Sequence, residues 1–412
     1  MPDIKSIPLS DKSGRALLPV IEDMRGRENA VVICNFGADD PSAPLSAHLL
    51  AGHAELLAGG LKALAGAAGC SEVLLYAAET DVQALCAALQ DAGLTASAVS
   101  GPASPVLREP TALYTVMEKG LIRTGIAELE YRRSFLSQGW QNRPTLTVDA
   151  ETAYAAGRMA GGLPAAKHVA VIGGETKIME LPLGSALSEA LGEPECKAVL
   201  LGGVAGSFLP PAETAGISLQ HVWEHDAAEL IGPDVCPVAR TAALYDRIRD
   251  LSCAKCVMCR EGSWQLSAIF GDMTAGKAGS EDIALIGEIA PLIEKGAICE
   301  FGHKMVRPAL TATAVFSEAF NTHIETRLCE AGQCAGLMRY VIDPARCTGC
   351  GECLDVCPED AITGEPDFIH MINENYCSRC GRCAEACPSD AVLHTGSRIK
   401  VPRRLTRVGR FR

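Results

Sequence analysis

Two groups of four cysteines in the last third of the chain constrain its fold more than any other feature. Each group reads C-x2-C-x2-C-x3-C-P, and the groups start at residues 347 and 377. In this spacing, three cysteines of one group bind one four-iron cluster and the fourth binds the other. The motif therefore predicts two [4Fe-4S] clusters, one on Cys347, Cys350, Cys353 and Cys387, the other on Cys377, Cys380, Cys383 and Cys357. A structural disulfide array is the alternative, which the duplicated spacing disfavours.

Cysteine usage also predicts the compartment. The 412 residues include 19 cysteines, and no secretory signal pattern opens the sequence. Oxidising compartments would scramble so many thiols, and metal ligation requires thiolates. We therefore expect a cytoplasmic protein.

Hydropathy predicts no membrane-spanning helix, and net charge disfavours nucleic acid as a partner. The longest charge-free stretches, 92–107 and 198–212, contain glycines and prolines and are shorter than the roughly 20 apolar residues of a membrane-spanning helix. A net charge of -13 disfavours nucleic acid. The last segment, 397–412, nevertheless carries seven basic residues, which predicts either a solvated tail or one that docks on an acidic partner.

The pattern of apolar residues before the cysteine-rich part predicts a multidomain protein of the α/β plus α+β class. Segment 1–29 is mixed and polar, and we interpret it as a lead-in segment without a cofactor signal. Region 30–165 alternates short apolar runs with alanine- and leucine-rich stretches, which indicates a Rossmann-like layer with a largely parallel sheet. The expected strands are 30–35 and 72–77, and the expected helices are 46–68, 81–92, 113–119 and 151–159.

Two further modules are predicted before the ferredoxin domain at 336–396. Region 166–235 combines strands with a short helix, as in a compact β-grasp unit. Region 236–335 shows apolar residues at spacings of three and four, which predicts a helical bundle in which Pro291 should kink or restart a helix. Within 166–235 the expected strands are 168–172, 177–181 and 197–201, with a helix at 185–191.

The predicted bundle has an iron-sulfur motif of its own. Cys253, Cys256 and Cys259 form C-x2-C-x2-C, and Cys299 follows forty residues after the third. Three closely spaced thiolates and a distant fourth suit a third [4Fe-4S] cluster. A structural zinc ion is the alternative, because closely spaced cysteines also suit a tetrahedral site.

A second set of potential ligands lies between the bundle and the ferredoxin domain. His323, Cys329 and Cys334 form H-x5-C-x4-C. Thiolates and imidazole at such spacing suit zinc, and Cys236 is the best candidate for a fourth ligand. The alternative is a set of ordinary thiols and a surface histidine.

These motifs together resemble a known family. The stretch 253–262, Trp264, Cys299, the cysteines and histidine at 323–334, and the double ferredoxin motif are similar to the flavoprotein subunit of electron-bifurcating hydrogenases and NAD-linked formate dehydrogenases. That subunit is itself similar to the NADH-binding flavoprotein subunit of complex I. The resemblance covers roughly 30–396 and is strong from 236 onward. It implies that the module near 166–215 is the family's soluble-ligand-binding β-grasp domain, and it supports Cys236 as a zinc ligand.

The resemblance also implies a degenerate FMN and NADH site. Family members hold FMN on a glycine-rich loop just before the strand at 30–35, and residues 13–27 contain no such loop. Pro110 replaces a residue that the family uses near the nicotinamide. In the segment 144–152, Val148 and Asp149 stand where the family has two flavin-contacting asparagines, and an aspartate would repel phosphate.

The predicted function is therefore an iron-sulfur electron-transfer subunit of a multisubunit oxidoreductase, which passes single electrons between a catalytic subunit and donor or acceptor subunits. The sequence shows no catalytic nucleophile or acid–base pair that stands out. An FMN-dependent NAD(P)H dehydrogenase subunit is the first alternative, and a structural or assembly subunit is the second.

Overall fold

The structure is a computed structural model that describes residues 9–10, 16–124, 139–221 and 225–411. The chain divides into two compact units. The first unit contains 1–233, 244–267 and 285–315, and the second contains 234–243, 268–284 and 316–412. Each unit is described separately below.

A parallel four-stranded sheet forms the core of the first unit, with strand order β3-β2-β1-β4. Val31 pairs with Glu72 on one side and with Thr145 on the other. Every residue of β1 is buried, which explains its continuous apolar run. The strands are β1 (Val31–Asn35), β2 (Glu72–Ala78), β3 (Ser97–Gly101) and β4 (Thr145–Asp149). The Rossmann-like parallel core is thus confirmed, with β3 and β4 in addition to the two expected strands.

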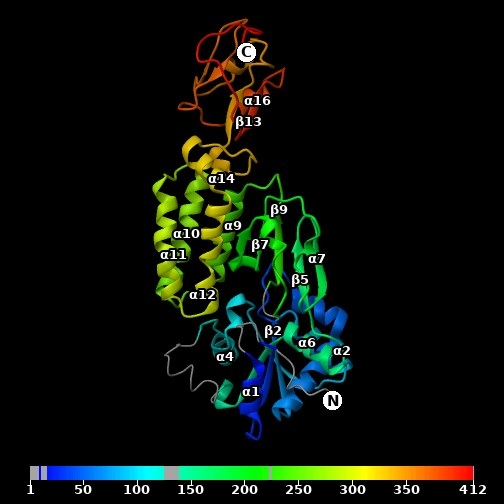
Figure 1. The fold of residues 1–412 in the computed structure, drawn as a ribbon. Helices are drawn as coiled ribbons and strands as arrows, with labels where there is room; N and C mark the ends of the chain where they lie inside the picture. The colour runs from blue at the N-terminus through cyan, green and yellow to red at the C-terminus, as the bar shows by residue number, and fades with distance from the viewer. Residues whose placement is uncertain (1–8, 11–15, 125–138, 222–224, 412) are drawn as a thin grey trace. The chain divides into compact units, whose positions relative to one another are not determined.

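Helices pack on this sheet (Figure 1). They are α1 (Leu17–Met24), α2 (Leu45–Ala68), α3 (Val82–Asp91), α4 (Pro110–Lys119) and α6 (Ala150–Ala160), with a 3-10 turn η2 (Pro105–Arg108) before α4 and η3 (Trp140–Asn142) before β4. The helix α1 falls inside the expected lead-in segment. Its apolar side chains Leu17, Val20, Ile21 and Met24 are buried in the sheet core, so this stretch is part of the domain.

Two glycines let α2 and α6 cross at backbone contact. A Cβ atom on Gly60 would lie 1.8 Å from the carbonyl oxygen of Ala153, and one on Gly157 would lie 1.9 Å from that of Leu56. Any side chain at either position would push the helices apart. This crossing fixes the place of the residues that α2 and α6 carry.

A mixed five-stranded sheet follows in the same unit, with order β6-β5-β9-β7-β8. Its strands are β5 (Ala166–Ile172), β6 (Thr176–Pro182), β7 (Ala198–Leu201), β8 (Ser207–Leu209) and β9 (Ala227–Ile231), accompanied by α7 (Ser188–Leu191), η4 (Gly203–Ala205) and α8 (Pro211–Thr214). Val169, Leu187 and Leu219 lie in its core. The sequence pattern predicted β5, β6, β7 and the short helix, and it missed β8 and β9.

Helices dominate from residue 237 to 321. They are α9 (Pro237–Leu251), α10 (Val257–Ala275), α11 (Glu281–Gly296), α12 (Glu300–Lys304), α13 (Arg307–Val315) and α14 (Ser317–Asn321). Within the first unit, the buried Tyr245 hydroxyl donates to the carbonyl of Met305 at 2.7 Å and accepts from the amide of Ala309 at 3.0 Å. Pro291 lies inside α11, which continues to Gly296, so the helix does not restart at Pro291. No helix of the described residues is both long and apolar enough to span a membrane.

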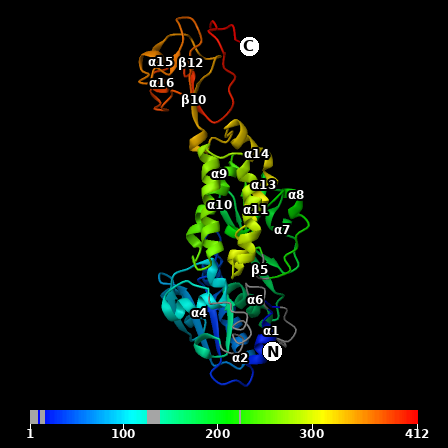
Figure 2. The ribbon, with the colours of Figure 1, turned by 90° about the vertical axis from the view of Figure 1, so that its left-hand side faces the viewer.

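The C-terminal part of the second unit is a twofold repeat (Figure 2). The antiparallel pairs are β10 (Arg339–Ile342) with β13 (Val392–Thr395), and β11 (Ile362–Thr363) with β12 (Met371–Ile372). The helices α15 (Glu352–Asp355) and α16 (Arg382–Glu385) occupy equivalent places in the two halves. This is the expected ferredoxin fold around the eight cysteines.

The basic tail docks on this ferredoxin fold. The amide of Ile369 donates to the carbonyl of Thr406 at 2.9 Å, and the amide of Val408 donates to that of Asp367 at 3.0 Å. Phe411 packs against the ferredoxin core. Main-chain hydrogen bonds thus hold the described part of 397–412 on the chain's own ferredoxin domain, while its basic side chains remain exposed to solvent.

Candidate metal centres

The first candidate centre gathers Cys253, Cys256, Cys259 and Cys299 in the first unit. The helix α10 begins at Val257, so Cys253 and Cys256 lie on the loop before it and Cys259 lies in its first turn. Cys299 precedes α12, as the helix N-cap. Cys256, Cys259 and Cys299 are buried, and Cys253 is half-buried.

The surroundings of these thiols disfavour uncompensated negative charge. Burial is the largest effect and raises the pKa of Cys299 to about 12. The Gly302 amide opposes it, and the weaker effects of the Cys253 and Cys259 charges add to it. Burial likewise raises the pKa of Cys259. Thiolates at these positions need a positively charged partner, which iron ions supply.

In the ferredoxin fold, the thiols group as crossed sharing requires. Burial and then the charges of Cys347, Cys350 and Cys387 raise the pKa of Cys353 to about 12. The pKa of Cys383 is raised by burial and also by the charges of Cys377, Cys357 and Cys380. Each set takes its fourth member from the other motif.

Backbone amides of the two halves donate to equivalent sulfurs. The amide of Ala361 lies 3.4 Å from the Cys357 Sγ, and that of Ala391 lies 3.3 Å from the Cys387 Sγ. Such N–H···S contacts raise the potential of a cluster by stabilising its reduced form. Ser389, with its Oγ 3.5 Å from the Cys387 Sγ, has no counterpart in the first half, because Glu359 occupies that position. The two halves therefore differ in hydrogen bonding to sulfur.

The second unit brings Cys236, His323, Cys329 and Cys334 together. All four are buried, and one ligand atom from each lies within 4.8 Å of the others. The Cys236 Sγ is 3.3 Å from the His323 Nε2 and 3.7 Å from the Cys334 Sγ. The His323 Nδ1 faces the carbonyl of Ala319 at 2.7 Å, which leaves Nε2 for a metal.

These distances fit a zinc ion. Tetrahedral zinc with standard bond lengths places two sulfurs roughly 3.8 Å apart and sulfur and nitrogen roughly 3.6 Å apart. The Cys334 thiol, and more weakly His323, lower the pKa of Cys236 to about 4 against the effect of burial. Burial lowers the pKa of His323, but Cys236 outweighs it and raises the pKa to about 9. The low pKa of Cys236 favours the thiolate form, which is the form that binds zinc.

Ligand spacing separates this centre from the iron-sulfur sites. Among the described residues, the groups with three or more ligand atoms within 4.8 Å are the Cys236 group and a set of three histidines. The quartet of Cys253 and the ferredoxin quartets are more open. A single zinc ion needs close ligands, whereas a four-iron cluster occupies more space.

The residues at the expected flavin site have other structural tasks. Val148 is buried in β4. Asp149 caps α6, because its carboxylate accepts from the Thr152 amide at 3.0 Å and from the Thr152 hydroxyl at 2.9 Å. The helix α1 occupies the described part of the segment where the family has its glycine-rich loop.

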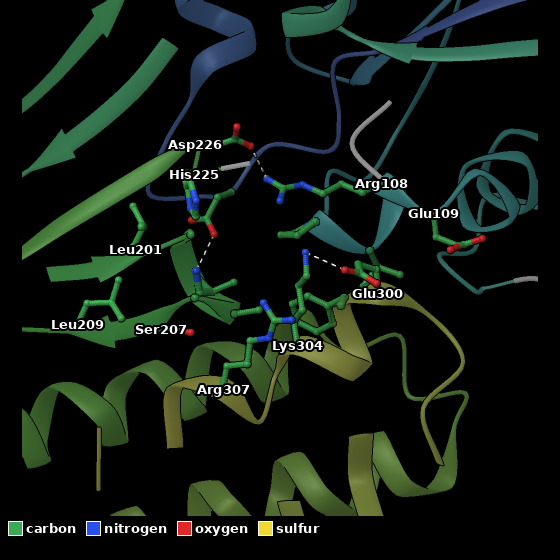
Figure 3. A pocket seen from close by; sticks show the side chains of 18 of the residues that line it. Arg108, Glu109, Leu201, Ser207, Leu209, His225, Asp226, Glu300, Lys304 and Arg307 are labelled. Atoms are coloured by element: carbon green, nitrogen blue, oxygen red, sulfur yellow. Dashed lines mark hydrogen bonds and ion pairs between the residues drawn. The ribbon is translucent and has the colours of Figure 1, made fainter. Parts of the chain in front are cut away.

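A cavity of about 270 Å³ lies in the first unit (Figure 3). Asp40 and Glu109 line it, together with Arg108 and Lys304. Arg108 pairs with Asp226 at 3.1 Å, and Lys304 pairs with Glu300 at 2.7 Å. Carboxylates of the wall partly neutralise these two cations, and Arg307, which also lines the cavity, adds a third positive charge.

The sequence interpretation missed four histidines that the structure singles out. His370 is buried, with its Nδ1 3.9 Å from the Cys347 Sγ, and burial lowers its pKa. The three others, His48, His53 and His168, form the second close group of ligand atoms. Burial, and then His168 and His53, lower the pKa of His48. The only signal in the sequence is that His48 and His53 share one expected helix, which is too weak to predict a site.

Two family descriptions match the chain. Residues 239–323 match the NADH-ubiquinone oxidoreductase-F iron-sulfur binding region, and residues 346–391 match a 4Fe-4S dicluster domain. These regions contain the Cys253 quartet and the two ferredoxin motifs. The chain is an iron-sulfur protein of the [4Fe-4S] class.

Curated relatives are subunits of redox enzymes. The chain is 30% identical over 202 residues to the NADP-reducing hydrogenase subunit HndC of Solidesulfovibrio fructosivorans, covering 45% of this chain and 41% of the relative. It is 26% identical over 127 residues to the NADP(+)-dependent formate dehydrogenase subunit beta of Moorella thermoacetica, covering 31% and 17%. It is 33% identical over 78 residues to an NADH-quinone oxidoreductase subunit of Streptomyces coelicolor, covering 19% and 17%. The matches thus span less than half of each relative.

A solved structure shares the fold. The crystal structure of an NAD+-reducing [NiFe]-hydrogenase aligns with a TM-score of 0.69 at 21% identity, over 77% of this chain and 61% of that chain. At this identity the likeness concerns the fold alone. Over part of its length, the chain is therefore a homologue of subunits of an NADP-reducing hydrogenase, an NADP(+)-dependent formate dehydrogenase and an NADH-quinone oxidoreductase.

Proposed function

We propose that this chain is the electron-transfer subunit of a multisubunit oxidoreductase and carries single electrons through three [4Fe-4S] clusters. The observation that carries the proposal is the coexistence of three cysteine quartets with a nucleotide region whose flavin-contacting positions have other tasks. One cluster would lie on Cys253, Cys256, Cys259 and Cys299, and two would lie on the crossed ferredoxin quartets. When bound, the clusters would accept and release one electron each, and the protein's part is to bury and hydrogen-bond their ligands.

The degenerate flavin region argues against a dehydrogenase activity of the chain itself. Asp149 serves as a helix cap, and an aspartate near a flavin phosphate would repel it. Arg108 and Lys304 in the cavity wall pair with carboxylates, which weakens their attraction for phosphate. We therefore expect electrons to enter and leave through partner subunits.

The zinc ion that we assign to Cys236, His323, Cys329 and Cys334 has a structural role. Four protein ligands close a tetrahedral site, so no position is left for a substrate or an activated water. The amide of Cys329 also donates to the carbonyl of Gly396, which follows β13, at 2.9 Å. Zinc would thus anchor the ferredoxin fold to the start of α9 within the second unit.

Flavin release tests the proposal against its alternative. Purified holoprotein, precipitated with acid, should release no stoichiometric flavin fluorescence. One flavin per chain would instead support the FMN-dependent NAD(P)H dehydrogenase. Rapid reduction of the clusters by the cognate donor, followed by EPR, would exclude a purely structural or assembly role.

Metal content tests the number of centres. Three cubanes require about 12 iron per chain. We expect Cys299→Ser to lose about four iron and one EPR signal, whereas Cys70→Ser, at a half-buried thiol outside the quartets, should lose none. A yield of about eight iron in the unaltered protein would remove the Cys253 cluster.

The proposal extends to the cellular setting. Clusters and free thiols need a reducing compartment, which in the default case is the cytoplasm. The named relatives are subunits, so we expect a catalytic subunit and further redox subunits as partners. Isolation of the native complex would identify its largest subunit and hence its substrate.

A further inference from the structure

We propose that His48, His53 and His168 of the first unit form a binding site for a divalent transition-metal ion, with zinc as the best fit. One ring nitrogen from each lies within 4.8 Å of the others. Three nitrogens bound to tetrahedral zinc would lie roughly 3.4 Å apart, so shifts of about 1 Å would complete the site. None of the three residues belongs to a cysteine centre.

His168 is prepared as a ligand. It lies on β5 and is buried, and its Nδ1 is 3.0 Å from a carboxylate oxygen of Glu151, which is buried as well. An ionised carboxylate only accepts hydrogen bonds, so the proton of the neutral ring sits on Nδ1 and Nε2 keeps its lone pair. A carboxylate that orients a histidine in this way is the usual support of a metal-binding imidazole.

The second ring nitrogen of His168, Nε2, forms no hydrogen bond within the described structure. This nitrogen is buried and finds no hydrogen-bond partner among the described residues. A buried acceptor without a partner is unfavourable, and a bound ion or water would satisfy it. This unpartnered atom is the second observation, independent of the histidine cluster, that indicates a ligand.

A local break in α2 brings the two other histidines to His168. In a regular helix, residues five positions apart point roughly 140° away from each other. His53 has φ -140° and ψ 30° within α2, so the helix is interrupted at the residue that would otherwise point away from His48. The ring centroids of His48 and His53 then lie 5.4 and 5.6 Å from that of His168.

The neighbourhood limits how far these rings can move. The ring of Tyr154 on α6 lies 4.9 Å from that of His168 and 5.1 Å from that of His53. The Tyr154 hydroxyl donates to Glu180 at 2.7 Å, which orients the ring. Gly60 and Gly157 fix the crossing of the helices that carry His53 and Tyr154.

The site is open on one side. His48 and His53 are half-exposed, whereas His168 lies at the buried end. An ion can therefore enter from solvent, and a water molecule can take the fourth position of a tetrahedral site with three protein ligands. The site differs in this respect from the closed, thiolate-rich centre at Cys236.

Zinc binding to the full chain tests the proposal when the cysteine site is disabled. The experiment uses Cys329→Ser/Cys334→Ser protein, made without a histidine tag, loaded with iron-sulfur clusters and dialysed to equilibrium against buffered free zinc. We expect about one zinc per chain, with only nitrogen and oxygen neighbours in the zinc X-ray absorption spectrum. Adding His48→Gln and His53→Gln should abolish that zinc, whereas His221→Gln, at an exposed histidine outside the cluster, should retain it.

A variant of Glu151 tests whether this carboxylate orients the His168 ring for metal binding or only packs against it. Glu151→Gln can still contact His168 but no longer fixes the proton on Nδ1, so zinc affinity should fall by about 10- to 100-fold while iron content stays unchanged. Loss of iron or of helical circular dichroism in the His48 and His53 variants would show misfolding, and the single variant His48→Gln would then be decisive. Zinc binding that is absent from the cysteine-site variant, or that persists unchanged without His48 and His53, would overturn the proposal.

Discussion

Cys357 and Cys387 determine how the two ferredoxin clusters share their ligands. Under crossed sharing, Cys387 belongs with Cys347, and double variants therefore lose iron non-additively. Cys347→Ala/Cys387→Ala should remove one cluster and leave about eight iron of about 12, whereas Cys377→Ala/Cys387→Ala should remove two and leave about four. Iron analysis of the reconstituted proteins measures this. The opposite order of the two double variants would show that each motif binds its own cluster.

Residues with a fixed ligand spacing could be predicted from the sequence, and isolated residues could not. The C-x2-C-x2-C spacing of Cys253, Cys256 and Cys259 is enough to predict that they bind an iron-sulfur cluster. His168 and His53 are far apart in the sequence, and only the crossing of α2 and α6 and the break at His53 make them neighbours. Cys236 was a candidate for the fourth zinc ligand without a spacing motif of its own, because 87 residues separate it from His323, and the family resemblance supported it.

At the scale of elements, the crossing of α2 and α6 makes a prediction about stability. Gly60→Ala and Gly157→Ala place a Cβ less than 2 Å from a carbonyl oxygen, which overpacks the interface and should destabilise it by roughly 1–3 kcal/mol. Gly59→Ala is the matched control, because a Cβ there meets no atom within 4 Å and should stabilise the helix by roughly 0.5–1 kcal/mol. Hydrogen exchange of the α2 and α6 amides would report both changes. Equal exchange in all three variants would refute the close crossing.

Zinc removal makes a second prediction at this scale. The ligands lie at the start of α9, in the π-helical turn η5 (Thr322–Thr326) and beside the 3-10 turn η6 (Ala335–Leu337) that leads into β10. A chelator that removes zinc should therefore increase hydrogen exchange over 323–338 and leave β1 unchanged. Cys334→Ser should reproduce the effect, and Cys196→Ser, at a half-buried thiol outside the site, should not. Unchanged exchange after verified zinc loss would contradict the anchoring role.

Strong local patterns explain which elements could be predicted. The strand β1 and the helix α2 have long apolar or alanine-rich patterns, and both were expected within one residue of their observed bounds. The strand β3 (Ser97–Gly101) carries small and polar side chains, so its pairing with β2 determines it more than its own sequence does. The helix α1 was missed although Leu17, Val20, Ile21 and Met24 have helical spacing, because a pattern of only eight residues with a proline among them is a weak signal.

At the scale of the whole molecule, the chain combines a flavoprotein-like scaffold with retained iron-sulfur centres. The cysteine motifs lie in the regions that match known iron-sulfur families, whereas the positions corresponding to flavin contacts have become a helix cap and a buried valine. This contrast supports the proposed electron-transfer role, because the cysteine quartets are present whereas two positions that contact flavin in the family carry other side chains.

Counting electrons tests this central claim most directly. The anaerobic holoprotein would be titrated with a low-potential reductant such as titanium(III) citrate, and the electrons taken up per chain would be measured. Three cubanes accept one electron each, so the predicted uptake is about three electrons per chain. An uptake of about five, which three clusters and a two-electron flavin would give, would contradict the proposed role.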